Sequence, residues 1–134
     1  MDVAAALGLS ERLEFEIGDA FEIFSNEDRF ARDSVDMFWL DFGVGDRVAD
    51  FVRGLWPAIA PGGFVVCHST LTNRATRQWL EAVRRGAGEA ETGLPPSEVH
   101  HVSLLEPHKH FQNALTLLQK RPAGFEEPLY SERA

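Results

Sequence analysis

Two short apolar runs, separated by a segment with helical periodicity, constrain the fold of this chain most strongly. Residues 35–40 and 64–67 are largely apolar, as in strands that are covered on both faces of a parallel sheet. Between them, apolar side chains recur at helical spacing from Val48 to Ile59, and Asp46 is expected to cap this helix. The sequence Pro61-Gly62-Gly63 is expected to end it. Strand, helix and strand in this order predict a parallel pair joined by a helical crossover.

The flanking segments extend this alternation. Residues 13–17 place Leu, Phe and Ile alternately with Glu, which is strand periodicity, and residues 99–105 and 111–118 are two further strand candidates with a hairpin-length connection. Helices are expected at residues 3–7, at 21–24 and, capped by Thr72 or Asn73, up to Val83. The order predicts an α/β fold with a mostly parallel sheet and an antiparallel C-terminal hairpin.

Composition narrows the class of protein further. The 134 residues are 44% hydrophobic and 25% charged, which fits one domain, at residues 1–121, with a polar tail at 122–134. A net charge of −8 argues against nucleic acid as a partner, and no apolar run approaches the roughly 18 residues of a membrane span. The single cysteine, Cys67, fits a reducing, cytoplasmic location and closes an apolar run, so we expect a buried thiol rather than a nucleophile.

Four segments in this order carry a resemblance. They are residues 9–20 (LSERLEFEIGDA), 35–41 (VDMFWLD), 55–66 (LWPAIAPGGFVV) and the final hairpin. In this order, they resemble four parts of class I S-adenosylmethionine-dependent methyltransferases. The first is similar to strand three with its acidic turn, and the second to strand four with its terminal aspartate. The third is similar to the helix, turn and strand five, and the hairpin to strands six and seven. The nearest subgroup is the small-molecule O-methyltransferases of the catechol and caffeoyl-CoA kind. The resemblance implies a Rossmann-like fold and methyl transfer from S-adenosylmethionine to the oxygen of a small-molecule acceptor.

The chain departs from that family at its amino-terminal end. Two βα units come first in the family and supply a glycine-rich turn and an acidic residue for the cofactor, and residues 1–17 hold neither. Without those strands, the strand at 13–17 loses its neighbours. It is expected to pair with the strand at 35–40, to exchange in a homodimer, or to meet another chain that supplies the missing strands. The alternative function is a truncated, non-catalytic domain that acts as a subunit or interaction module.

Candidate cofactor residues follow from the place where open α/β sheets bind ligands, outside the carboxyl ends of their strands. This rule selects Asp19, Asp41, His68, Ser69 and the loop at residues 106–110. The resemblance implies that Asp19 binds the adenine amino group, while the backbone at Ala20 or Phe21 contacts a ring nitrogen. The alternative for Asp19 is a cap on the helix that follows.

The resemblance also implies a divalent metal, although with an altered ligand set. Asp41 matches the aspartate that coordinates the cation in metal-dependent members, but their Asp-Asn pair after strand five aligns with His68 and Ser69 here. Since magnesium prefers oxygen ligands, the family's standard magnesium mechanism is not expected to transfer. Asp41 and His68 are the candidate catalytic residues, orienting or deprotonating the acceptor.

A second metal hypothesis uses the hairpin loop. If that loop opens at the same edge of the sheet, Glu106, His108 and His110 can approach Asp41 and His68, a ligand set that suits zinc, manganese or iron. Alternatively, His68 or His108 acts as a general base, because imidazole titrates near neutral pH. The plainer interpretation is that the three loop residues are only polar hairpin residues.

Overall fold

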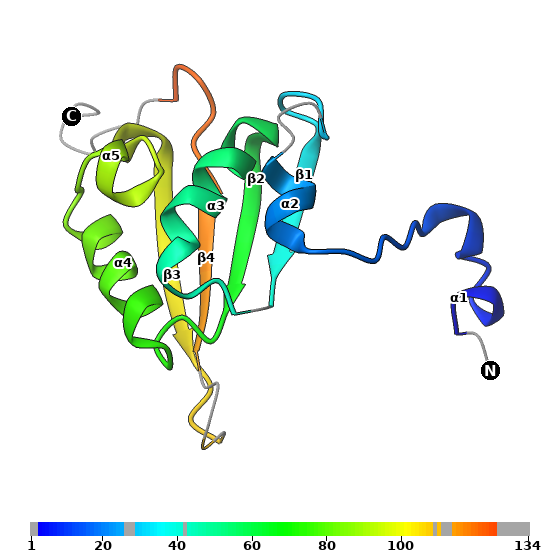
Figure 1. The fold of residues 1–134 in the computed structure, drawn as a ribbon. Helices are drawn as coiled ribbons and strands as arrows, with labels where there is room; N and C mark the ends of the chain where they lie inside the picture. The colour runs from blue at the N-terminus through cyan, green and yellow to red at the C-terminus, as the bar shows by residue number, and fades with distance from the viewer. Residues whose placement is uncertain (1–2, 26–28, 42, 109, 111–113, 126–134) are drawn as a thin grey trace, which may run out of the picture.

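The chain folds around one mixed four-stranded sheet (Figure 1). A computed structural model describes residues 3–25, 29–41, 43–108, 110 and 114–125. The strands are β1 (Val35–Leu40), β2 (Ile59–His68), β3 (Val99–Leu105) and β4 (Ala114–Lys120), in the spatial order β1-β2-β4-β3. The β1–β2 pairing is parallel, whereas β4 is antiparallel to both β2 and β3. All strands except β4 therefore run in one direction, and the predicted α/β fold with a C-terminal hairpin is confirmed.

The helices are short and most of them lie on one side of the sheet. They are α1 (Val3–Ala6), α2 (Ala20–Ser25), α3 (Val48–Leu55), α4 (Arg74–Arg84) and α5 (Glu89–Thr92). In Figure 1, α2, α3, α4 and α5 all lie in front of the sheet. The core fills the space between these helices and the sheet, and at its centre Val52, Ile59, Val65, Leu80 and Leu118 are fully buried.

The helix between β1 and β2 is shorter than its apolar stripe predicts. α3 ends at Leu55, a 3-10 turn covers Trp56–Ala58, and Ile59 already belongs to β2. Pro57 explains the early end, because its ring cannot follow a regular α-helical turn. The predicted turn at residues 61–63 lies within β2 instead, where the register with β1 shifts. The predicted cap at Asp46 is also wrong, because that residue lies in a 3-10 turn and Arg47 precedes the helix without a side-chain cap.

The strand predicted at residues 13–17 does not form. This segment is extended but pairs with no described strand, and Phe15 and Ile17 are 84% and 102% exposed. Pairing with β1 within the same chain is therefore also wrong. The arm of residues 9–18 leads away from the sheet (Figure 1), and it is held on its polar side, where Glu16 accepts a hydrogen bond from Arg29 at 2.5 Å. Strand periodicity was present, but periodicity cannot supply a neighbour to pair with.

The predictions for α4 and the hairpin are confirmed in most of their details. Asn73 caps α4, and its Oδ1 accepts hydrogen bonds from the backbone amides of Ala75 and Thr76. The last strand begins at Ala114, and residues 111–113 of its predicted span lie outside the described residues. The segment at 86–97, expected as a loop, contains α5 and a 3-10 turn. The tail prediction for residues 126–134 also lies outside the described residues.

Gly93 should be the glycine least tolerant of substitution. Its φ is +73°, and a Cβ at this position would lie 2.0 Å from the carbonyl oxygen of Ala49 on α3. Gly86 has a similar φ of +70° but nothing within 4 Å of its would-be Cβ. We expect Gly86→Ala to cost about 1–2 kcal/mol of unfolding free energy through left-handed strain alone. Gly93→Ala should cost at least about 2 kcal/mol more through overpacking. Urea unfolding of both variants measures the difference, and equal losses would contradict the proposed close approach.

Candidate functional site

The pairing of β1 with β2 brings two predicted site residues together. Leu40 lies opposite Cys67 in this parallel register, so Asp41 and His68 stand side by side at the carboxyl ends of the two strands. The Nδ1 atom of His68 is 2.8 Å from Oδ1 of Asp41. Glu106 follows β3 at the same edge of the sheet, and its Oε2 lies 3.8 Å from Nε2 of His68. The imidazole at the end of β2 therefore lies between two carboxylates, one at the end of β1 and one at the end of β3.

Chemistry fixes the roles of the two ring nitrogens of His68. A carboxylate can only accept a hydrogen bond, so an unprotonated imidazole beside Asp41 must carry its hydrogen on Nδ1. The lone pair on Nε2 then faces the side of Glu106. The His68 side chain is 14% exposed, which shelters it from bulk water while leaving one edge open. This arrangement can accept a proton at Nε2, and Asp41 can stabilise the resulting imidazolium.

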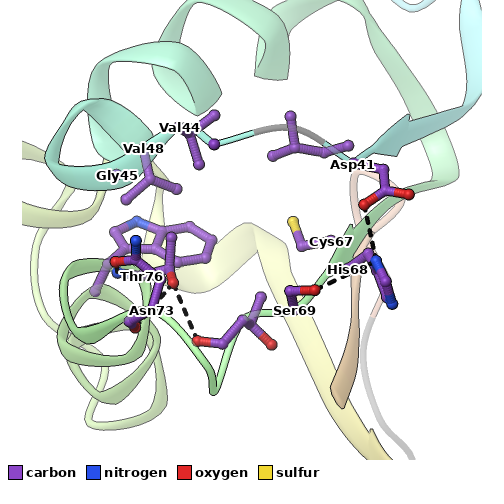
Figure 2. A pocket seen from close by; sticks show the side chains of 13 residues that line it. Asp41, Val44, Gly45, Val48, Cys67, His68, Ser69, Asn73 and Thr76 are labelled. Carbon is purple, nitrogen blue, oxygen red and sulfur yellow. Dashed lines mark hydrogen bonds and ion pairs between the residues drawn. The ribbon is translucent and has the colours of Figure 1, made fainter. Parts of the chain in front are cut away.

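A cavity of about 170 Å³ opens beside this pair (Figure 2). Its wall follows from a turn at Ser69, whose φ of +61° directs the chain from β2 toward the cap of α4. The lining residues are Leu40, Asp41, Gly43, Val44, Gly45, Val48, Cys67, His68, Ser69, Thr70, Asn73, Thr76 and Trp79. Pockets for drug-sized ligands usually occupy about 300 Å³ or more. The cavity therefore has room for a small acceptor group and not for a whole nucleotide-sized cofactor.

Several lining residues were not anticipated from the sequence. Thr70 and Thr76 are buried, and Thr76 Oγ1 donates to the carbonyl of Thr70 at 3.1 Å. Thr70 Oγ1 lies 2.7 Å from Thr116 Oγ1, which ties the cavity floor to β4. Threonines in a loop and a helix carry no sequence signal of this kind. Nor did the sequence indicate that the ring of Trp79 on α4, which is 6% exposed, would line a cavity.

Asp19 lies apart from this cavity. Its Oδ1 accepts a hydrogen bond from the backbone amide of Phe21 at 2.8 Å, so the helix-capping interpretation is confirmed. Neither Asp19 nor Ala20 lines the cavity beside His68. The Phe21 ring lies under the guanidinium of Arg47, at 3.6 Å from its centroid. The adenine-binding role of these residues stays a prediction.

The predicted metal ligands are only partly brought together. Asp41 and His68 meet, and Glu106 approaches them, whereas His108 and His110 are exposed in the hairpin loop. Within the described part of the chain, no group of three or more His, Cys, Asp or Glu side chains is arranged to hold a metal ion. Two of the four proposed ligands therefore contact each other, and the metal stays a prediction.

Cys67 is buried at 2% exposure on the core side of β2, as expected. Burial raises the pKa of its thiol to about 12, so the reactive thiolate is scarce at neutral pH.

We expect Cys67 not to react with Ellman's reagent at pH 8 while the chain is folded, and to react fully in 6 M guanidinium chloride (about the strength that unfolds most domains). Absorbance at the thionitrobenzoate band measures both. Rapid modification of the folded protein would contradict a thiol enclosed by the core.

Comparison with known proteins gives structural similarity only. No known family profile matches the chain, and no curated protein is similar to it in sequence. Among solved structures, a Corynebacterium glutamicum protein superimposes with a TM-score of 0.65 at 20% identity, over 95% of this chain and 55% of its own. The Bacillus cereus O-methyltransferase in complex with SAH also gives 0.65, at 11% identity, over 88% of this chain and 55% of its own.

A third solved structure agrees with these two. The Streptomyces achromogenes O-methyltransferase TomG, in complex with SAM, gives a TM-score of 0.58 at 16% identity, over 88% of this chain and 54% of its own. The chain thus has the class I methyltransferase fold, and it spans little more than half the length of the structures that it matches. Within the described residues, no helix is both long enough and apolar enough to cross a membrane.

Proposed function

We propose that this chain carries the acceptor side of an S-adenosylmethionine-dependent methyltransferase that acts on an oxygen of a small molecule. The observation that supports it is the Asp41–His68 pair at the mouth of a cavity, on a fold shared with two solved O-methyltransferases. S-adenosylmethionine, when bound, supplies a methyl group activated on a sulfonium sulfur. The chain's own part is to bind the acceptor, orient its oxygen and remove the proton.

The residues of the cavity can perform this part. His68 accepts the acceptor's hydroxyl proton at Nε2, and Asp41 holds the ring in the required tautomer and offsets the new positive charge. The apolar side chains of Val44, Val48 and Trp79 line the cavity and shield the acceptor from water. A shielded acceptor is more readily held with its oxygen in line with the methyl group. Oε2 of Glu106, 3.8 Å from Nε2, is too far for a hydrogen bond, but its negative charge also favours the imidazolium.

The chain supplies only part of a cofactor site. Asp19 is exposed at the start of α2, and its carboxylate is a suitable acceptor for an exocyclic amine such as that of adenine. Residues 1–17 contain a single glycine, Gly8, and so no glycine-rich turn for the methionine end. We therefore expect this chain by itself to bind the cofactor through its adenine end.

Substitution of Asp19 should separate cofactor binding from helix capping. Asp19→Ser keeps an oxygen that can cap α2 but removes the carboxylate, whereas Asp19→Ala removes both. A charge-assisted hydrogen bond contributes about 1.5–3 kcal/mol. We expect S-adenosylhomocysteine to bind at least about tenfold more weakly to both variants, as measured by calorimetric titration. If neither S-adenosylmethionine nor S-adenosylhomocysteine gives a heat of binding with the folded wild-type chain, catalysis by this chain alone is overturned.

His68 should be tested with an activity measurement. We expect His68→Gln to lower kcat for a catechol acceptor by about 10²–10⁴-fold, because it removes the general base. Asp41→Asn should lower kcat less, through loss of the tautomer constraint. Transfer of tritium from labelled S-adenosylmethionine measures both, and His101→Gln on the solvent-exposed part of β3 is the control. A His68→Gln variant as active as the control would contradict the proposed base.

A non-catalytic subunit is the competing proposal. The observation in its favour is the exposure of apolar side chains on the sheet, at Met37, Trp39 and Val102, together with the limited share of the matching structures that this chain spans. The cofactor titration separates the two proposals, because an interaction module needs no affinity for S-adenosylmethionine.

A further inference from the structure

A second cavity, of about 380 Å³, lies at the end of the sheet opposite the Asp41–His68 pair. It is bounded by the chain before β1, the turn before β3 and the segment that follows β4. Since β1, β2 and β3 run in one direction, this is the end where those strands begin, the upper end of the sheet in Figure 1. We call it the amino-end cavity. Its volume lies within the range of roughly 300–1,000 Å³ that small-molecule sites occupy.

A buried ion pair brings two segments of the chain to the amino-end cavity. The ammonium of Lys120, at the end of β4, lies 2.9 Å from Oδ1 of Asp33, which precedes β1. The same ammonium donates to two backbone carbonyl groups, at 2.8 and 3.3 Å, so all three of its hydrogens are used within the chain. The sequence neighbours of this pair are Arg32 and Arg121. The ion pair thus fixes two arginines at the wall of one cavity.

Neither arginine is neutralised within the described part of the chain. No carboxylate of a described residue forms an ion pair with Arg32 or Arg121. Arg121 donates one of its five N–H groups, at Nε, to Nε2 of His100 at 3.0 Å. No described residue accepts a hydrogen bond from its terminal nitrogens. Both guanidinium groups therefore have donors available for a ligand.

The amino-end cavity is positively charged, although the protein is acidic. Three cations and two carboxylates are among the described residues that line it, whereas the whole chain has a net charge of −8. The carboxylate of Asp33 is paired with Lys120, and that of Glu98 accepts a hydrogen bond from the indole N–H of Trp56 at 3.2 Å. Two guanidinium groups at one cavity repel each other, and an anion between them would be attracted to both.

We propose that the amino-end cavity binds an organic phosphate whose phosphate group is held by Arg32 and Arg121. A guanidinium presents a fork of N–H donors, and a single fork already saturates a carboxylate. A phosphate monoester has three terminal oxygens and a charge of about −1.5 to −2 at pH 7, so two forks can share it. Phe125, which is 47% exposed and packs edge-on against the ring of His100, offers an apolar surface to the organic part. This inference does not rest on the proposed methyl transfer.

Calorimetric titration of the whole chain with phenyl phosphate tests the proposal. We expect a dissociation constant below about 1 mM near neutral pH and at low salt. Arg32→Gln and Arg121→Gln should each raise it about tenfold or more, because each removes a charge-assisted contact. The matched control is Arg77→Gln, at an exposed position of α4 outside the amino-end cavity, which changes the net charge equally. It should change the constant by less than about twofold.

Amide NMR shifts of the wild-type chain during the same titration show where phenyl phosphate binds, without any substitution. We expect the resonances of Arg121, Gly124 and Phe125 to move, and those of Ser69 and Asn73 beside the other cavity to stay in place. Failure of S-adenosylhomocysteine to bind would leave this result unchanged, so the two proposals fail separately.

The proposal is overturned if phenyl phosphate gives neither heat nor NMR shifts up to about 10 mM, well above the expected constant. Equal weakening in the Arg77→Gln control would overturn it as well, because general charge attraction would then explain the binding. Inorganic phosphate that binds as tightly as phenyl phosphate would show that the cavity contributes nothing to an organic part. Benzoate that binds as tightly would show that a carboxylate suffices, and either result contradicts the proposed ligand class.

Discussion

The parallel pairing of β1 with β2 is the interaction on which the rest of the structure depends. The two apolar strands are parallel, so the chain must return from the end of β1 to the start of β2. α3 makes this return across one face of the sheet. The same register places Leu40 opposite Cys67, so that the next residues, Asp41 and His68, leave the sheet side by side. Core formation and site formation are thus consequences of one pairing.

The one-sided arrangement of the helices has two effects on the molecule. On the helix side, the turn at Ser69 and the cap at Asn73 enclose a small cavity beside the Asp41–His68 pair. On the opposite side, Met37, Trp39, Val102 and Leu104 are between 49% and 63% exposed. Alternation along β2 places the His68 side chain on the side away from Cys67, at the edge of this exposed surface.

Sequence patterns predicted local structure well where the pattern and the packing agree. β1 forms at the predicted residues because β2 lies beside it, and Asn73 caps α4 as expected because a cap depends only on residues close in the sequence. The pattern failed at residues 13–17, where alternation is clear but none of the described strands lies alongside. It also failed at Ile59, where an apolar side chain that fits a helical stripe begins β2 instead. At both places, the secondary structure depends on which neighbouring element buries the apolar side chains. The amino-acid pattern is compatible with more than one such neighbour.

The amino-acid pattern was enough to predict the α/β class, the four strands from residue 35 onward, the buried thiol of Cys67 and the candidacy of Asp41 and His68, since these follow from periodicity and from residue type at strand ends. The tertiary structure alone decided that Asp41 bonds His68, that Glu106 approaches from β3, and that Thr70, Thr76 and Trp79 line the cavity. The physical reason is the distance along the chain between the residues that make contact. Periodicity reports which face of an element is apolar, but contacts between residues far apart in the chain depend on sheet order and register, which only the assembled core fixes.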